Sequence, residues 1–212
     1  MEHSAVIRLS HCHKHIFCFS VPEECPSCGE QLKGSRLQEA PVKLPCPLTD
    51  GHKTSCCLLV TADDLDRAFD GTSDLHTGIS NNKGVVYNYT RAGVRRDQSG
   101  WERCLSVPLV RPDMFYLLAQ WDQYLDRFSD GPMWDTVWHR FDEDSHNCFS
   151  FCLQFINSVL AMEGRSLLTR EFFTKSFIVP RMTRVYKYLT LYHHVQKQQY
   201  YVVDRPEEGP EL

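Results

Sequence analysis

The chain has 212 residues and a net charge of −4; 42% of its residues are hydrophobic, including 12 Phe, 9 Tyr and 4 Trp. A domain usually takes about 100–200 residues, so we expect one well-packed core plus a small additional module. The high hydrophobic content excludes a disordered chain. The 23 basic residues are scattered without a stripe, which argues against nucleic acid as a partner. No run of about 18 apolar residues occurs, so no membrane span is expected.

Ten cysteines and the first residues set the expected compartment. The start, MEHSAVIRLSH, lacks the basic segment and the apolar run of a secretory signal. We therefore expect an intracellular protein, cytoplasmic or nuclear, in which thiols stay reduced. Clustered cysteines in such a protein indicate metal binding or thiol chemistry before they indicate disulfides.

Residues 1–32 are predicted to form a zinc-knuckle or ribbon hairpin. Short strands are expected over 5–10 and 15–21, and CPSCG at 25–29 follows as a tight turn. Two thiolates on one such turn can both reach a tetrahedral zinc at about 2.3 Å. The predicted ligands of a structural Zn²⁺ are Cys12, Cys18, Cys25 and Cys28. Imidazole also binds zinc, so one of the first two thiols could be replaced by His11, His13 or His15.

A metal would supply free energy that this small module lacks. About 30 residues bury too little surface to fold unaided, whereas metal binding contributes on the order of several kcal/mol to folding. Residues 1–55 contain six basic and six acidic residues and are therefore neutral, so contact with the phosphates of a nucleic acid is not expected. Residues 33–55 contain three Pro and two Gly and are predicted to be a linker.

Residues 56–203 are predicted to form an α+β domain, with an antiparallel sheet packed against helices. Strand-like runs occupy 56–61, 75–80, 84–89 and 104–110, separated by turn sequences such as SNNKG and RRDQSG. Helical spacing of apolar residues predicts a helix opened by Pro112, a second over about 147–163 and a shorter one within 167–177. Residues 186–203 alternate enough for a hairpin, with a helix over the first half as the alternative. The acidic tail 204–212 is expected to be disordered.

The second helix opens with a candidate nucleophile. Asn147 is placed to cap it and Cys148 is its first residue, where free N–H groups and the helix dipole favour a thiolate. Cys152 lies one turn later on the apolar stripe and is interpreted as packing. The strand 75–80 offers His76 as a general base, on the same face as Gly78 and projecting toward a helix laid across the sheet.

These stretches carry a family resemblance. The strand LHTGI with its His, the strand GVVYNY and the helix opening HNCFSF resemble circularly permuted papain-like folds, such as the NlpC/P60, lecithin retinol acyltransferase-like and PPPDE peptidase families. Over roughly residues 56–162 the resemblance implies Cys148 as nucleophile and His76 as base. The third polar residue of such sites stays open between Asn88 and His139. The acyltransferase-like pattern has an acidic residue or His where this chain has Phe149.

A second resemblance spans most of the chain. The run SNNKGVVYNYTRAGVRRDQSGWERCLSVPLV, together with CPSCG, resembles the makorin-2 opposite-strand family, which is defined by a domain of unknown function. It implies no particular activity, so the chemistry has to be argued from the residues.

Two functions are compatible with the sequence. The first is a thiol enzyme that hydrolyses or transfers an acyl or isopeptide group through a thioester on Cys148. The second is a non-catalytic, zinc-stabilised interaction module on a decayed papain-like fold. It would bind a protein partner through an aromatic surface near Trp101, Trp134 and Trp138.

Overall fold

The computed structural model describes residues 5–32, 37, 39–62 and 74–205. It divides the chain into two compact units, each with its own antiparallel sheet and with helices, which is the expected α+β class. One unit combines residues 1–46 with 187–212, and the other comprises residues 47–186. None of the described helices is long and apolar enough to cross a membrane.

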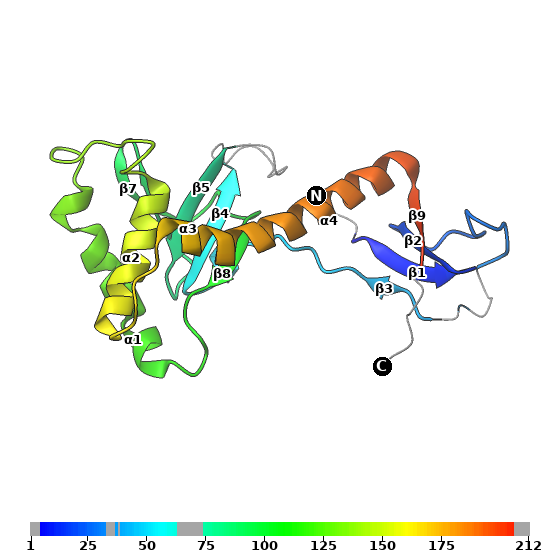
Figure 1. Cartoon of the computed structure of the whole chain (residues 1–212), viewed down its shortest axis with the longest axis horizontal. Helices are drawn as coiled ribbons and strands as arrows, with labels where there is room; N and C mark the ends of the chain where they lie inside the picture. The colour runs from blue at the N-terminus through cyan, green and yellow to red at the C-terminus, as the bar shows by residue number, and fades with distance from the viewer. Residues whose placement is uncertain (1–4, 33–36, 38, 63–73, 206–212) are drawn as a thin grey trace. The chain divides into compact units, whose positions relative to one another are not determined.

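The first unit contains a four-stranded sheet in the order β3-β1-β2-β9, and Figure 1 shows β1, β2 and β9 side by side. The strands are β1 (Ile7–His11), β2 (Lys14–Cys18), β3 (Val42–Lys43) and β9 (Tyr200–Asp204). A tight turn joins β1 to β2 through Cys12 and His13, which both have positive φ angles, 43° and 60°. The small core beneath the sheet consists of Leu9, Ile16, Cys18, Cys25 and Leu32.

The C-terminal segment departs from the predicted hairpin. Residues Val179–Gln198 form one long helix, α4, so the hairpin prediction for 186–203 is wrong over its first half and the helical alternative is right. Val185 and Leu189, four residues apart, are both buried, and this helical spacing overrides the weaker alternation. Only β9 is extended, and it pairs antiparallel with β2.

The division of the chain therefore differs from the expected boundaries at residues 32, 55 and 203. Strand β9 joins the N-terminal sheet instead of the main body, because its register pairs Val202 with Ile16. The expected linker 33–55 contributes β3 and a short 3-10 turn at Gly51–Lys53. Of the expected disordered tail, Asp204 ends β9 and the N–H of Arg205 donates to the carbonyl of His13, whereas 206–212 lie outside the described residues.

The second unit contains a five-stranded antiparallel sheet in the order β7-β6-β5-β4-β8. The strands are β4 (Cys57–Ala62), β5 (Leu75–Ser80), β6 (Val86–Thr90), β7 (Gly93–Asp97) and β8 (Leu105–Pro108). Four of them match predicted strands. The fifth, β7, was missed because the sequence RRDQSG was interpreted as a turn, whereas its first three residues end the strand.

Helices cover one face of this sheet. Helix α2 (Cys148–Met162) packs against β5 and β6, with the Cys152 thiol 3.6 Å from the Thr77 hydroxyl. Helix α1 (Phe115–Ser129) begins at Phe115 instead of Pro112, and the indole of its Trp121 donates to the carbonyl of Ser80. The third predicted helix is present as α3 (Arg170–Phe173), which continues through a π-helical turn at Thr174–Ile178 into α4.

The opposite face of the sheet carries a second core. Its members are Cys57, Leu59, Val86, Trp101 and Cys104. Gly78 lies beneath the Trp101 indole, since a Cβ at Gly78 would come within 2.9 Å of that ring and within 2.7 Å of Val86. The Trp101 indole therefore fills the space beside Gly78.

Candidate functional site

Cys148 is the first residue of α2, as expected. The Asn147 side chain accepts the N–H of Ser150 and the Ser150 hydroxyl accepts the N–H of Asn147, which makes a reciprocal capping box. A helix cannot satisfy its first N–H groups internally, and this cap takes up only that of Ser150. The N–H groups of Cys148 and Phe149 therefore remain for a ligand at the helix start.

His76 contacts Cys148 close to where the β5–β6 pairing ends. Strand β5 pairs with β6 over Gly78–Ser80 and stays paired with β4 at His76. Helix α2 lies on the Thr77 face of the sheet, whereas His76 belongs to the Trp101 face. We expected the imidazole to project toward a helix laid across the sheet. Instead it meets α2 at the first residue of the helix, Cys148.

The surroundings of Cys148 favour its thiolate. Burial by itself raises the pKa of this thiol, but a hydrogen bond and the charge of His76, with smaller contributions from the Thr77 hydroxyl and backbone N–H, lower the pKa below its ordinary value. Cys148 and His76 are 9% and 8% exposed, so both groups are largely withdrawn from water yet remain reachable. Geometry and electrostatics thus join the two residues that the sequence singled out.

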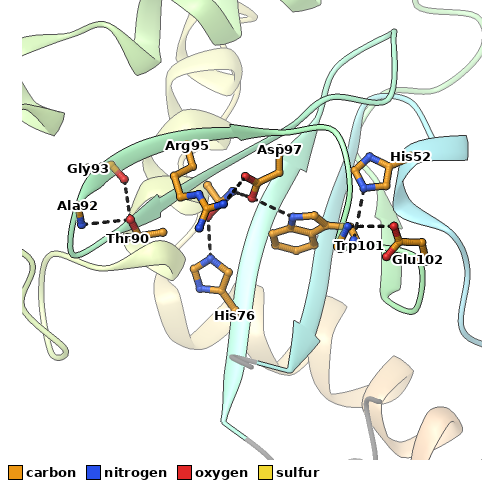
Figure 2. Close-up of polar contacts among 11 residues, drawn as sticks. His52, His76, Thr90, Ala92, Gly93, Arg95, Asp97, Trp101 and Glu102 are labelled. Carbon is orange, nitrogen blue, oxygen red and sulfur yellow. Dashed lines mark hydrogen bonds and ion pairs between the residues drawn. The ribbon is translucent and has the colours of Figure 1, made fainter. Parts of the chain in front are cut away.

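Asn88 supplies the third polar group. Its Oδ1 lies 2.9 Å from Nε2 of His76, and its Nδ2 donates to Asp97 at 2.7 Å. Figure 2 shows His76 pointing toward the Arg95 and Asp97 side chains of β7. The other candidate, His139, packs instead against His146, with ring centroids 5.7 Å apart.

The Cys148–His76 pair opens into a cleft of about 690 Å³. Apolar and charged groups line it together, with Leu75, Phe141 and Phe149 among the former. Two of its arginines are engaged with acids of the same cleft, Arg91 with Glu143 and Arg95 with Asp97. A pocket of this size suits a peptide tail or an acyl group.

A second group of reactive side chains lies in the first unit. The ligand atoms of His11, Cys12, Cys25 and Cys28 all lie within 4.8 Å of one another, so this cluster could hold a metal ion. The sulfurs of Cys12 and Cys25 are 3.7 Å apart, and the sulfur of Cys28 is 3.5 Å from Nδ1 of His11. Tetrahedral zinc would set such separations at about 3.8 and 3.6 Å.

Two further contacts support this cluster. Nε2 of His11 lies 3.2 Å from the Glu30 carboxylate, the partner that usually fixes the ring of a metal-bound histidine. The CPSCG turn closes through a hydrogen bond from the N–H of Gly29 to the carbonyl of Cys25, and the N–H of Ser27 donates to the Cys25 sulfur. These contacts hold the CPSCG turn and the His11 ring beside the other donor atoms.

Cys18, one of the four predicted ligands, is not in this cluster. It pairs with Ile7 at the far end of the β1–β2 hairpin, whereas His11 pairs with Lys14 beside the turn that carries Cys12. The Cys18 thiol is buried in the small core, 4.0 Å from the carbonyl of Ile7. His11 occupies the fourth position, one of the three histidine replacements left open by the sequence.

Family models match both parts of the chain. DUF4796 C-terminal covers residues 41–195, and DUF4796 N-terminal covers residues 4–32. The chain belongs to the DUF4796 family. It is similar to the MKRN2 opposite strand protein of Homo sapiens, with 44% identity over 206 residues, which cover 96% of this chain and 92% of that protein. No solved structure matches this DUF4796 chain.

Proposed function

We propose that this DUF4796 protein is a cysteine hydrolase or an acyl or isopeptide transferase, with Cys148 as nucleophile and His76 as general base. The observation that carries the proposal is the contact between a thiol at the start of α2 and the His76 imidazole of β5, where both line an open cleft. A buried structural cysteine needs neither a lowered pKa nor an oriented histidine. Cys152, four residues later, has neither.

The same residues account for each step of such a reaction. Nδ1 of His76 takes the thiol proton, and the Cys148 sulfur attacks a carbonyl carbon to form a tetrahedral oxyanion. The free N–H groups of Cys148 and Phe149 stabilise that oxyanion. The imidazolium then protonates the leaving amine or alcohol, which produces a thioester. Water or an acceptor amine, deprotonated by His76, resolves the thioester and restores the thiol.

The resemblance to circularly permuted papain-like folds supports this proposal. In that arrangement the histidine strand precedes the helix that begins with the nucleophile, as β5 precedes α2 here. A Cys-His-Asn set is the papain variant of the catalytic triad, and Asn88 gives this chain the third member. The fold assignment belongs to the proposal together with the activity.

We propose Zn²⁺ as the ion for the cluster in the first unit. Three thiolates and one imidazole form a donor set that zinc prefers, and four protein ligands would leave no position for water, so its role would be structural. All ten cysteines are free thiols, as a zinc-binding, thiol-dependent protein of the cytoplasm or nucleus requires.

The acyl-enzyme itself is the direct test of the proposed activity. Incubation with p-nitrophenyl acetate should release p-nitrophenol in a burst and add one acetyl group to Cys148, detected by peptide mass spectrometry. Cys148→Ala should abolish the burst, and His76→Ala should slow it by roughly 10²-fold or more. Cys152→Ala is the matched control and should retain the burst. Equal acetylation of the wild type and the His76→Ala chain would contradict the proposal.

One observation favours the non-catalytic alternative. Val137 and Trp138 are 78% and 75% exposed, whereas Trp101 and Trp134 are buried, so the expected aromatic surface is reduced to one tryptophan. Exposed apolar side chains of this kind occur at protein contact sites. A chain that shows no acetyl-enzyme and whose Trp138→Ala variant loses self-association or partner binding would support this alternative.

A further inference from the structure

Asp97 is a buried carboxylate next to the proposed catalytic histidine. It is 8% exposed, at the end of β7, and its Oδ2 accepts hydrogen bonds from Nδ2 of Asn88 at 2.7 Å and from the Trp101 indole at 3.3 Å. Its other oxygen lies 3.1 Å from the Arg95 guanidinium. Burying a carboxylate costs free energy unless such partners compensate it, so its place beside Asn88 calls for a function.

The hydrogen bond from Asn88 to Asp97 has only one possible direction. An ionised carboxylate can only accept, so the Asn88 atom that faces it must be the amide nitrogen. The amide oxygen of Asn88 then faces His76, and because a carbonyl oxygen only accepts, Nε2 of His76 must carry a hydrogen. In the neutral ring Nδ1 then carries no hydrogen, which is the form that can take a proton from Cys148.

The charged state depends on the same orientation. Once His76 has taken the thiol proton, both ring nitrogens carry hydrogens, and Nε2 needs an acceptor. A flipped Asn88 would present its NH₂ group to Nε2 and repel the imidazolium. Nothing in the Asn88 side chain itself selects between the two orientations, because the oxygen and nitrogen of an amide have nearly the same size.

Trp101 holds Asp97 in position. The Trp101 indole bonds to it, and the Trp101 backbone is fixed in turn, with its N–H 3.4 Å from Nε2 of His52 and its carbonyl accepting the N–H of Gly51. Figure 2 shows this row of side chains from His76 past Asp97 to Trp101 and His52. The carboxylate is therefore presented to Asn88 by packed, hydrogen-bonded neighbours instead of by a mobile loop.

We infer that Asp97 is a positioning residue that locks the Asn88 amide and thereby fixes the reactive tautomer of His76. The inference rests on the proposed function, because it assigns Asp97 a role in the reactivity of the Cys148–His76 pair. It extends the site from β5 and β6 to β7, the strand that the sequence did not predict. Asp97 touches neither reacting atom and acts only through Asn88.

The first experiment compares alkylation rates of Cys148 by iodoacetamide at pH 7. Asp97→Ala should lower the rate about tenfold or more, because each unit by which a thiol pKa rises lowers its thiolate fraction about tenfold. Asp97→Asn keeps an oxygen that can accept from Asn88 and Trp101, so it should retain most of the rate. Asp130→Ala removes an acid that pairs with Arg96 on the same strand and should have no effect.

A double-mutant cycle separates positioning from general damage. If Asp97 acts only through Asn88, the Asp97→Ala change should have no further effect on alkylation in an Asn88→Ala chain. If the losses of alkylation rate caused by Asp97→Ala and Asn88→Ala were additive in the double variant, the inference would be overturned. An Asp97→Asn chain that is as slow as Asp97→Ala would also overturn it.

A spectroscopic measurement reads the tautomer of His76 in the wild-type chain. Long-range ¹H–¹⁵N correlation spectra of ¹⁵N-histidine protein, recorded at a pH high enough for the ring to be neutral, should show His76 as the Nε2–H tautomer, with its signals assigned by their loss in His76→Ala. An Nδ1–H tautomer would overturn the inference.

The two levels of failure are distinguishable. If His76→Ala leaves wild-type alkylation unchanged, the proposed function fails. If His76→Ala slows alkylation but Asp97→Ala does not, only the role of Asp97 is overturned.

Discussion

Two cysteines one helical turn apart show how strongly local surroundings decide the chemistry of a thiol. Cys148 and Cys152 lie on the same side of α2 and both contact Thr77. Burial raises the pKa of Cys152 well above its ordinary range, and Thr77 offsets only part of that rise. Cys148 is also buried, but His76 and the backbone N–H of Thr77 reverse the direction of the shift. Cys152 therefore serves as the internal control for Cys148.

Sequence reasoning named the residues of the proposed Cys–His pair but not all of the polar groups that the structure places around them. Asn147, Cys148 and His76 were identifiable because a helix cap and a strand histidine are local signals. Asn88 could be named only as one of two candidates, and Asp97 was assigned to a turn. Both depend on the pairing of β6 with β7, where Val86 lies opposite Asp97, and that register cannot be deduced from composition.

At the scale of elements, the candidate site lies where the pairing of β5 with β6 ends and α2 begins. The β5–β6 pairing runs from Gly78 to Ser80, whereas β5 stays paired with β4 at His76. The Asn147 cap fixes the start of α2, since its side chain also donates to the carbonyl of Glu143 in the preceding segment. The C-terminal hairpin failed as a prediction at this same scale. Short-range alternation over 186–203 was outweighed by the helical spacing of buried residues.

Loss of the cap should damage the site as well as the helix. Asn147→Ala removes both side-chain bonds at the start of α2, and we expect it to lower the free energy of unfolding by about 1–2 kcal/mol, measured by urea denaturation. Thr169→Ala removes the matching cap of the short, exposed α3 and should cost less. If the two changes were equally mild and Asn147→Ala left Cys148 alkylation unaltered, the cap would have no part in the site.

At the scale of the whole molecule, a unit with a candidate metal site accompanies a thiol-bearing unit. The described core of the first unit is small, so the metal proposed at His11, Cys12, Cys25 and Cys28 would help to stabilise it. The sequence predicted three residues of this cluster. It selected Cys18 over His11 because the register of the β1–β2 hairpin, which separates Cys18 from the turn, was unknown.

Removal of the metal should therefore lower mainly the stability of the first unit. We expect the purified chain to contain one zinc, measured by elemental analysis, and a strong chelator to lower its thermal stability. His11→Ala and Cys28→Ser should each lose the zinc. Cys18→Ala and the exposed control Cys46→Ser should retain it. Loss of zinc in Cys18→Ala with full retention in His11→Ala would restore the original four-cysteine assignment.

The central claim is that His76 lowers the pKa of Cys148 and so raises its thiolate fraction, and a pH titration of Cys148 alkylation tests this claim most directly. Because His76 lowers the pKa of Cys148, the alkylation rate of the wild-type chain should rise at a lower pH than the alkylation rate of an ordinary thiol. His76→Ala should move the midpoint to higher pH, and Cys152→Ala should leave it in place. A wild-type midpoint at or above that of a free cysteine, unchanged in His76→Ala, would contradict the account.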